Sequence, residues 1–213
     1  MSTEDRIERS RLLYEQFVFG GDATALVSAG RELDAVEADL TLARGRVMHG
    51  RFLAEGYEDP RELPSFEHAA QLYETLGDVR GVAESLFWVG IFHQVVRRDD
   101  DAAVPVFERS REFAAQVADP RILSYVLRHL GIAAHARGRL DDARAWLEES
   151  VRLRRQLGLL PGVAANMVGL AYIAAAQGRR DDAVALLDEA GTIAESTGAH
   201  GITRQVEEAR TSL

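Results

Sequence analysis

Apolar residues recur along this chain at intervals of three and four, the spacing that places them on one face of an α-helix. The C-terminal segment is the clearest case, because Ile202, Val206, Ala209 and Leu213 form one narrow stripe among polar residues. No stretch alternates apolar and polar residues for long enough to predict a β-strand. Ala, Leu, Arg and Glu are abundant, and all four favour helix by intrinsic propensity. The pattern therefore predicts an all-α protein.

Turn signals divide this pattern into short helices. Asp119 is a good N-cap, and Pro120 suits the first helical position. Gly138 can adopt the left-handed conformation that ends a helix, and the acidic pair Asp141-Asp142 then complements the positive end of the next helix. The same signals return at Gly158, Gly178, Asp181-Asp182 and Gly198, and more loosely at Asp99-Asp100-Asp101. Short turns of this kind predict antiparallel helix pairs.

The pairs repeat with a nearly constant period. Four segments beginning at Asp78, Asp119, Leu160 and His200 align with offsets of 41, 41 and 40 residues. Small and large apolar residues recur at matching positions inside the units. One unit has Leu130-Gly131, Gly138, Ala143, Leu147 and Ser150, and the next has Leu170-Ala171, Gly178, Ala183, Leu187 and Ala190. A unit this small cannot bury its apolar face alone, so the units are expected to stack.

The N-terminal third is less regular. We expect helices over Arg6 to Phe19, Ala23 to Glu37 and Leu40 to Gly56, a loop over Tyr57 to Pro64, and a helix over Ser65 to Leu76. The predicted organisation is a single domain over residues 1–213. It comprises a divergent helix pair (1–37), four repeats (38–77, 78–118, 119–159 and 160–199) and a capping helix (200–213).

The motif from Leu130-Gly131 to Ser150, and its copy from Leu170 to Ala190, resemble the signature of the tetratricopeptide repeat. The period of about 40 residues is similar to that of kinesin light chains and of large bacterial regulators of the signal-transducing ATPase type, and the resemblance extends from about Ala43 to the C-terminus. It implies a right-handed superhelix of stacked helix pairs, an α-solenoid. It also implies that the first helices of the pairs line a concave channel that holds a peptide or protein segment.

The resemblance further implies which residues line the channel. They are Tyr125, Arg128, Ile132 and His135; Ala165, Val168, Tyr172 and Ala175; Glu84, Phe87, Ile91 and Gln94; and Val47, Arg51 and Ala54. This mixture of apolar and polar groups suits an extended peptide or a small amphipathic ligand. The alternative for each aromatic residue is that it packs against the next helix. Some members of the family grip a C-terminal carboxylate with several inward-facing Lys and Asn residues. Here only Arg51 and Arg128 approach that role, so a clamp of that kind is not expected.

Composition excludes several other functions. A formal net charge of −9 argues against a nucleic-acid partner and against adhesion to an anionic membrane. There is no cysteine, hence no disulfide and no thiolate metal site. The segment from Met1 to Arg11 has no apolar signal region, so a cytoplasmic protein is expected. The uncharged segment from Leu159 to Ala176 is almost long enough to span a membrane, but its Pro161 and Asn166 favour a helix buried among others.

Candidate chemistry is sparse. The histidines His49, His68, His93, His129, His135 and His200 show no metal-ligand spacing, and helix capping explains the acidic pairs. Arg152, Arg154 and Arg155 fall on a second helix and are expected to face solvent. We therefore predict a protein- or peptide-binding scaffold with no cofactor, no metal and no catalytic residue. The alternatives are a small-molecule sensor or unusual enzyme that uses Glu84, His93, Arg128, His135 and Tyr172, and self-assembly into a homodimer.

Overall fold

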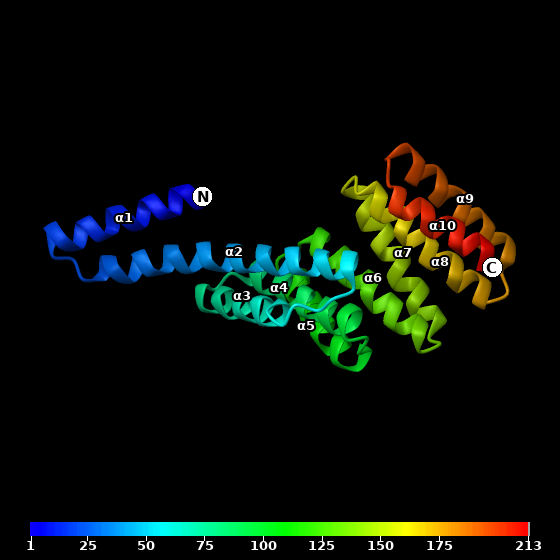
Figure 1. Cartoon of the computed structure of the whole chain (residues 1–213), viewed down its shortest axis with the longest axis horizontal. Helices are drawn as coiled ribbons and strands as arrows, with labels where there is room; N and C mark the ends of the chain where they lie inside the picture. Colours follow the sequence, from blue (N-terminus) through cyan, green and yellow to red (C-terminus); the bar gives the residue numbers. More distant parts are fainter. Residues whose placement is uncertain (213) are drawn as a thin grey trace. The chain divides into compact units, whose positions relative to one another are not determined.

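The computed structural model describes residues 1–212, and every regular element within that range is helical: ten α-helices and one π-helical turn. The expected all-α class, built from helix pairs that pack in chain order, is confirmed for the described residues (Figure 1). The contacts divide the chain into two compact units, Met1–Val106 and Phe107–Leu213. The expected single domain over residues 1–213 stays a prediction.

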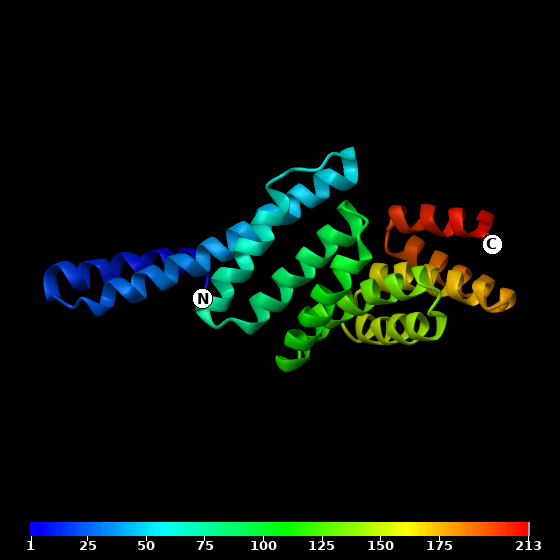
Figure 2. The ribbon, with the colours of Figure 1, turned by 90° about the horizontal axis from the view of Figure 1, so that it is seen from below.

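The first unit begins with a helical hairpin of unequal arms. Helix α1 (Thr3–Gly20) opens with a capping box between Ser2 and Asp5, and Gly21 ends it in the left-handed conformation. Helix α2 (Thr24–Glu55) is 32 residues long and runs well past α1, as two perpendicular views show (Figures 1 and 2). The prediction of two helices, ending at Glu37 and beginning at Leu40, is wrong. The residues between them are ordinary helix formers, so nothing stops α2 there. The boundary expected between residues 37 and 38 falls inside this helix.

Three further helical elements complete the first unit, and α5 (Asp100–Gln116) runs through its boundary. Helix α3 (Glu62–Leu76) packs on α2, and α4 (Val79–Ile91) packs on α3 and continues into the π-helical turn η1 (Phe92–Val96). Gly45 makes the α2–α3 packing possible, because a Cβ atom there would lie 2.4 Å from Cε1 of Phe66. Phe66 is fully buried in this contact.

The second unit is more regular. Helices α6 (Pro120–Ala136), α7 (Leu140–Gln156), α8 (Leu160–Ala176) and α9 (Arg180–Ser196) each have 17 residues, and α10 (His200–Ser212) follows. The glycines predicted to end helices have φ values near +70°, and Asp119 caps α6 by accepting hydrogen bonds from the backbone of Arg121 and Ile122. The helix boundaries predicted for this part of the chain are confirmed to within a residue or two.

The helices of the second unit form two layers. Successive helices pack against each other, and the first helices α6, α8 and α10 also contact one another in that order (Figure 1). Leu147 and Leu187 of the second helices are buried in the core between the layers. Val206 and Ala209 of the predicted C-terminal stripe are buried, and Ile202 packs beside them. Leu213, the last member of that stripe, lies outside the described residues.

Candidate functional site

The residues predicted on the face of α6 are accessible to different degrees. Ile132 is 37% exposed, whereas Tyr125, Arg128 and His135 are half-buried. They follow one another at intervals of three or four, so they share one side of the helix. On α8, Tyr172 is half-buried and its hydroxyl lies 3.4 Å from the hydroxyl of Ser212.

The other predicted residues have varied surroundings. Val168 of α8 is 6% exposed and belongs to the core of the second unit. In the first unit, Phe87 and Ile91 are also buried, while Arg51 is exposed. Two of the predicted polar residues already bind protein groups. Glu84 pairs with Arg46 and Arg80, and Gln94 donates a hydrogen bond to Asp100.

A polar network lies beneath the face of α6. We call it the Asn166 cluster, and it consists of Ser124, Arg128, Ser150, Arg154 and Asn166. The Asn166 Oδ1 atom accepts hydrogen bonds from Nη1 of Arg128 at 2.8 Å and from Nη1 of Arg154 at 3.3 Å. Its Nδ2 atom donates to Oγ of Ser150 at 2.7 Å, and that hydroxyl donates to the backbone carbonyl of Ser124. The cluster therefore links α6, α7 and α8.

Arg154 contradicts the expectation that the arginines of α7 face solvent. Arg152 and Arg155 are exposed, but Arg154 is only 3% exposed. Its guanidinium lies 4.8 Å from the centre of the Tyr125 ring, and its Nη1 donates to the backbone carbonyl of Gly162 at 2.8 Å. A Cβ atom at Gly162 would lie 2.9 Å from that same nitrogen, so glycine leaves the space that the guanidinium occupies.

The charges of the Asn166 cluster are not balanced within it. Arg128 donates to the backbone carbonyl of Ala165 at 2.9 Å and to Asn166, and Arg154 donates to Gly162 and Asn166. All of these acceptors are neutral. Burial lowers the pKa of Arg128. Burial, and then the neighbouring charge of Arg128, lower the pKa of Arg154 to about 10. Arginine side chains remain protonated in folded proteins, so both guanidinium groups are positively charged at neutral pH. The Nε atom of Arg154 is buried without a hydrogen-bond partner.

The cluster occurs in only one of the repeated units. Forty residues later, the positions of Arg154, Gly162 and Asn166 are occupied by Ala194, Ile202 and Val206, and forty residues earlier by Ala114, Ile122 and Val126. The earlier set and Ala194 and Val206 are buried, and Ile202 packs against the core. Neither Arg154 nor Asn166 was predicted from the sequence as a candidate site residue. The available signal was this break in an apolar pattern that both neighbouring units keep.

A second buried polar site lies in the first unit. Nδ1 of His49 on α2 is 2.9 Å from Oε1 of Glu62 on α3, and both side chains are buried. The His49 ring also lies edge-on to Trp88, with 5.6 Å between the ring centres. The other carboxylate oxygen of Glu62 has no hydrogen-bond partner. Burial raises the pKa of Glu62, and the hydrogen bond from His49 opposes that rise.

The described residues contain no candidate metal site and no candidate membrane span. Among residues 1–212, no group of three or more His, Asp or Glu side chains could hold a metal ion. No helix in the same range is long and apolar enough to cross a membrane. The acidic pairs Asp141-Asp142 and Asp181-Asp182 lie in the first turns of α7 and α9, as predicted.

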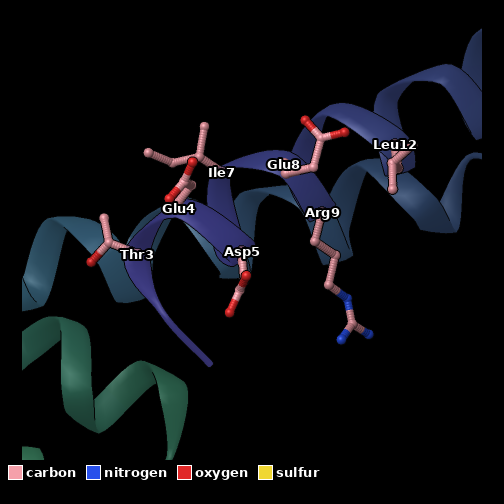
Figure 3. A pocket seen from close by; sticks show the side chains of 7 residues that line it. All are labelled: Thr3, Glu4, Asp5, Ile7, Glu8, Arg9 and Leu12. Carbon is pink, nitrogen blue, oxygen red and sulfur yellow. The ribbon is translucent and has the colours of Figure 1, made fainter.

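A hollow of about 820 Å³ lies along the outer surface of α1 and is lined by Thr3, Glu4, Asp5, Ile7, Glu8, Arg9 and Leu12. All of its walls come from this one helix. Figure 3 shows that Asp5 and Arg9 point to one side of α1, whereas Ile7 and Glu8 point to the other. The side chains do not converge on a common point, so they do not form a binding site.

One family model matches the chain, and it does so within the second unit. Residues 122–196 match the model of the tetratricopeptide-repeat family, which confirms the resemblance over that range. A crystal structure of BtubC (BKLC) from P. vanneervenii is similar to this chain at 18% sequence identity and a TM-score of 0.48, over 93% of each chain. No curated protein matches the chain. Tetratricopeptide repeats generally mediate protein–protein interactions.

Proposed function

Because residues 122–196 match the model of the tetratricopeptide-repeat family, we propose that the chain is a scaffold that binds a peptide segment of a partner protein on its first helices. The observation that carries the proposal is the accessible face of α6. Tyr125, Arg128, Ile132 and His135 lie along that face, and none of them is fully buried. A row of apolar and polar groups at helical spacing can contact alternate side chains of an extended peptide. The net charge of −9 favours a protein partner over a nucleic acid.

Val168, Phe87 and Ile91 have no part in this surface, because each is at most 6% exposed and contributes to the core instead. The residues that remain in the second unit are Tyr125, Arg128, Ile132, His135 and Tyr172. Those that remain in the first unit are Arg51, Glu84 and Gln94. The α6 residues form the best test because they lie on one helix and none of them is fully buried.

The proposal is tested by affinity purification from a lysate of the source organism, followed by mass spectrometry and a binding assay with each recovered partner. The variant Ile132→Glu places a charge on the proposed surface without disturbing the core, and we expect it to weaken binding at least about ten-fold. Val184 is a matched control, because it is an apolar residue of the second helix α9 and is 52% exposed. Val184→Glu should leave the affinity unchanged. Equal losses in both variants, or in neither, would contradict the assignment of this face.

We also propose that the protein forms a homodimer through α2. Ala29 is buried in the half of α2 that α1 accompanies, and Leu33, Leu40 and Val47 follow it at spacings that keep the same helix face. These three residues are 47%, 46% and 57% exposed, and their interval of seven is typical of helices that pack along their length. The same stripe on a second copy, running antiparallel, offers an identical apolar row of matching length.

Light scattering after gel filtration tests the dimer. The unmodified protein should have twice the mass of one chain, and the double change Leu40→Glu with Val47→Glu should produce a monomer. Leu12→Glu, at a residue of α1 that is 51% exposed, serves as the control and should remain dimeric. A monomeric unmodified protein at high concentration would exclude the proposal.

A further inference from the structure

The Asn166 cluster holds two positive charges that its own contacts do not neutralise. The Nη1 atoms of Arg128 and Arg154 share one neutral acceptor, Asn166 Oδ1, at 2.8 Å and 3.3 Å. Their other acceptors are backbone carbonyl groups. Bringing two like charges out of water is unfavourable unless an opposite charge compensates them.

Packing does not require these residues. The two neighbouring units place alanine, isoleucine and valine at the positions of Arg154, Gly162 and Asn166 and form apolar contacts there. The changes depend on one another, because the arginine needs the space that Gly162 leaves and the hydrogen bond that Asn166 accepts. Residues that break the packing pattern of a fold at a single place are typical of functional sites.

The two arginines differ in their access to solvent. Arg128 is half-buried on the same face of α6 as Ile132, whereas Arg154 lies behind it and is 3% exposed. Arg154 is held in place by Gly162 and by the ring of Tyr125. An incoming anion at the α6 face would therefore reach Arg128 before Arg154. Arg154 would add a second positive charge at short range, in surroundings that screen it poorly.

We propose that the Asn166 cluster is a subsite for an oxoanion, a carboxylate or a phosphate group, carried by the bound peptide. The inference rests on the proposed function, since the peptide on the α6 face would deliver the anion. A guanidinium group binds either oxoanion through two parallel hydrogen bonds. Arg128 is the contact residue, and Arg154 and Asn166 are positioning residues.

The first test uses inorganic phosphate and acetate, with sodium chloride at equal ionic strength as the reference. Phosphate or acetate at about ten times its Kd should raise the melting temperature of the unmodified protein by about 3 °C. The triple variant Arg154→Ala, Gly162→Ile, Asn166→Val copies the next repeat and should show no such rise. Arg152→Ala removes an exposed arginine from the same helix and should keep the full response. Equal responses in the triple variant and the unmodified protein would overturn the proposal.

Nuclear magnetic resonance of the arginine Nε–H groups provides a measurement on the unmodified protein alone. The Nε–H of Arg154 is buried without a partner, so its signal should be protected from exchange with water and should shift when phosphate or acetate binds nearby. No shift at saturating anion would overturn the proposal even if the triple variant failed to fold.

The second test uses three fluorescein-labelled alanine-rich peptides that carry glutamate, phosphoserine or glutamine at the same central position. The glutamate or phosphoserine peptide should bind at least about ten-fold more tightly than the glutamine peptide, and the preferred one identifies the oxoanion. The triple variant should lose this preference.

These measurements also separate the subsite from the function on which it rests. Peptide binding that is sensitive to Ile132→Glu but indifferent to charge would retain the scaffold and reject the anion subsite. A phosphate-induced shift of the Arg154 signal without any peptide binding would retain the anion subsite and reject the scaffold.

Discussion

The two buried polar sites of this protein differ in net charge. His49 and Glu62 form an acid–base pair at 2.9 Å, so the pair carries no net charge wherever its proton resides. Arg128 and Arg154 of the Asn166 cluster are two like charges with neutral partners. The first site can therefore be understood as part of the fold, because the two groups are hydrogen-bonded to each other and need no outside charge. The two positive charges of the second site are neutralised only when a group from outside the cluster supplies a negative charge.

The contact among α8, α9 and α10 shows what the second site would be without its charges. Ala194 and Val206 are buried there, and Ile202 packs beside them, at the positions equivalent to Arg154, Asn166 and Gly162. The helices have the same lengths and turns in both places, apart from the shorter α10. The repeat therefore also folds when this contact is apolar. Removing charged residues should lower the free energy of unfolding at the pair of His49 and Glu62 and raise it at the Asn166 cluster.

The largest effect is expected at the acid–base pair. His49→Leu keeps most of the packing but leaves Glu62 buried without its partner, so the free energy of unfolding should fall by about 3 to 5 kcal/mol. Chemical denaturation followed by circular dichroism measures this loss. His68 is a control, because it forms a 3.0 Å contact with Glu37 on the surface. His68→Leu should change stability by less than about 1 kcal/mol. A similar small change for His49→Leu would contradict the view of this pair as structural.

The next effect concerns the shared acceptor of the Asn166 cluster. Asn166→Val alone removes the oxygen to which both arginines donate, and the lost hydrogen bonds to charged groups should lower the free energy of unfolding by about 3 kcal/mol. Denaturation measures the change. Val126 and Val206 show that valine itself is compatible with this position of the repeat. An unchanged stability would mean that the arginines do not depend on Asn166.

The triple variant Arg154→Ala, Gly162→Ile, Asn166→Val should act in the other direction. Replacing a buried charged group by well-packed apolar residues is often stabilising, and we expect a gain of about 2 kcal/mol in the free energy of unfolding. The triple variant includes Asn166→Val, yet its free energy of unfolding should exceed that of the Asn166→Val single variant by about 5 kcal/mol. Such non-additivity is expected among residues in direct contact. A loss of stability in the triple variant would show that the charged cluster serves the fold.

The smallest effect is a dependence on pH at Glu62. Burial raises its pKa above the ordinary value of 4.5, the hydrogen bond from His49 opposes the rise, and the charges of Glu58 and Asp59 add to it. The folded protein thus holds this proton to higher pH than the unfolded chain does. The contribution of Glu62 to stability is complete below pH 4.5 and is lost as pH rises through the folded-state pKa.

Comparison with Glu62→Gln isolates this dependence. The stability of the unmodified protein relative to Glu62→Gln should fall as the pH rises from 4 through the folded-state pKa of Glu62. Glu67→Gln, at an exposed residue of the same helix, should give a flat difference. A relative stability that rises with pH would mean that the hydrogen bond from His49 outweighs the effect of burial.

The sequence was sufficient where local signals coincide with the repeat. Asp119, Gly138 and Gly158 act on the backbone next to them, so the boundaries of α6 and α7 could be predicted without knowledge of the packing. The same reasoning failed for α2, where the interruption expected after Glu37 had no glycine or proline to cause it. Among the predicted site residues, Tyr125, Arg128, Ile132 and His135 follow helical spacing along α6, but this spacing could not reveal that Val168 is buried.

The sequence by itself determined that this protein is a series of helix pairs with a period near 40 residues, because helix ends and apolar stripes depend on neighbouring residues. Only the tertiary structure decided that Arg154 lies inside, next to Arg128, rather than in solvent with Arg152. The environment of Arg154 is set by Gly162 and Asn166 on another helix. Whether a charge is buried depends on such contacts between helices, and these contacts cannot be predicted from the spacing of residues along one helix.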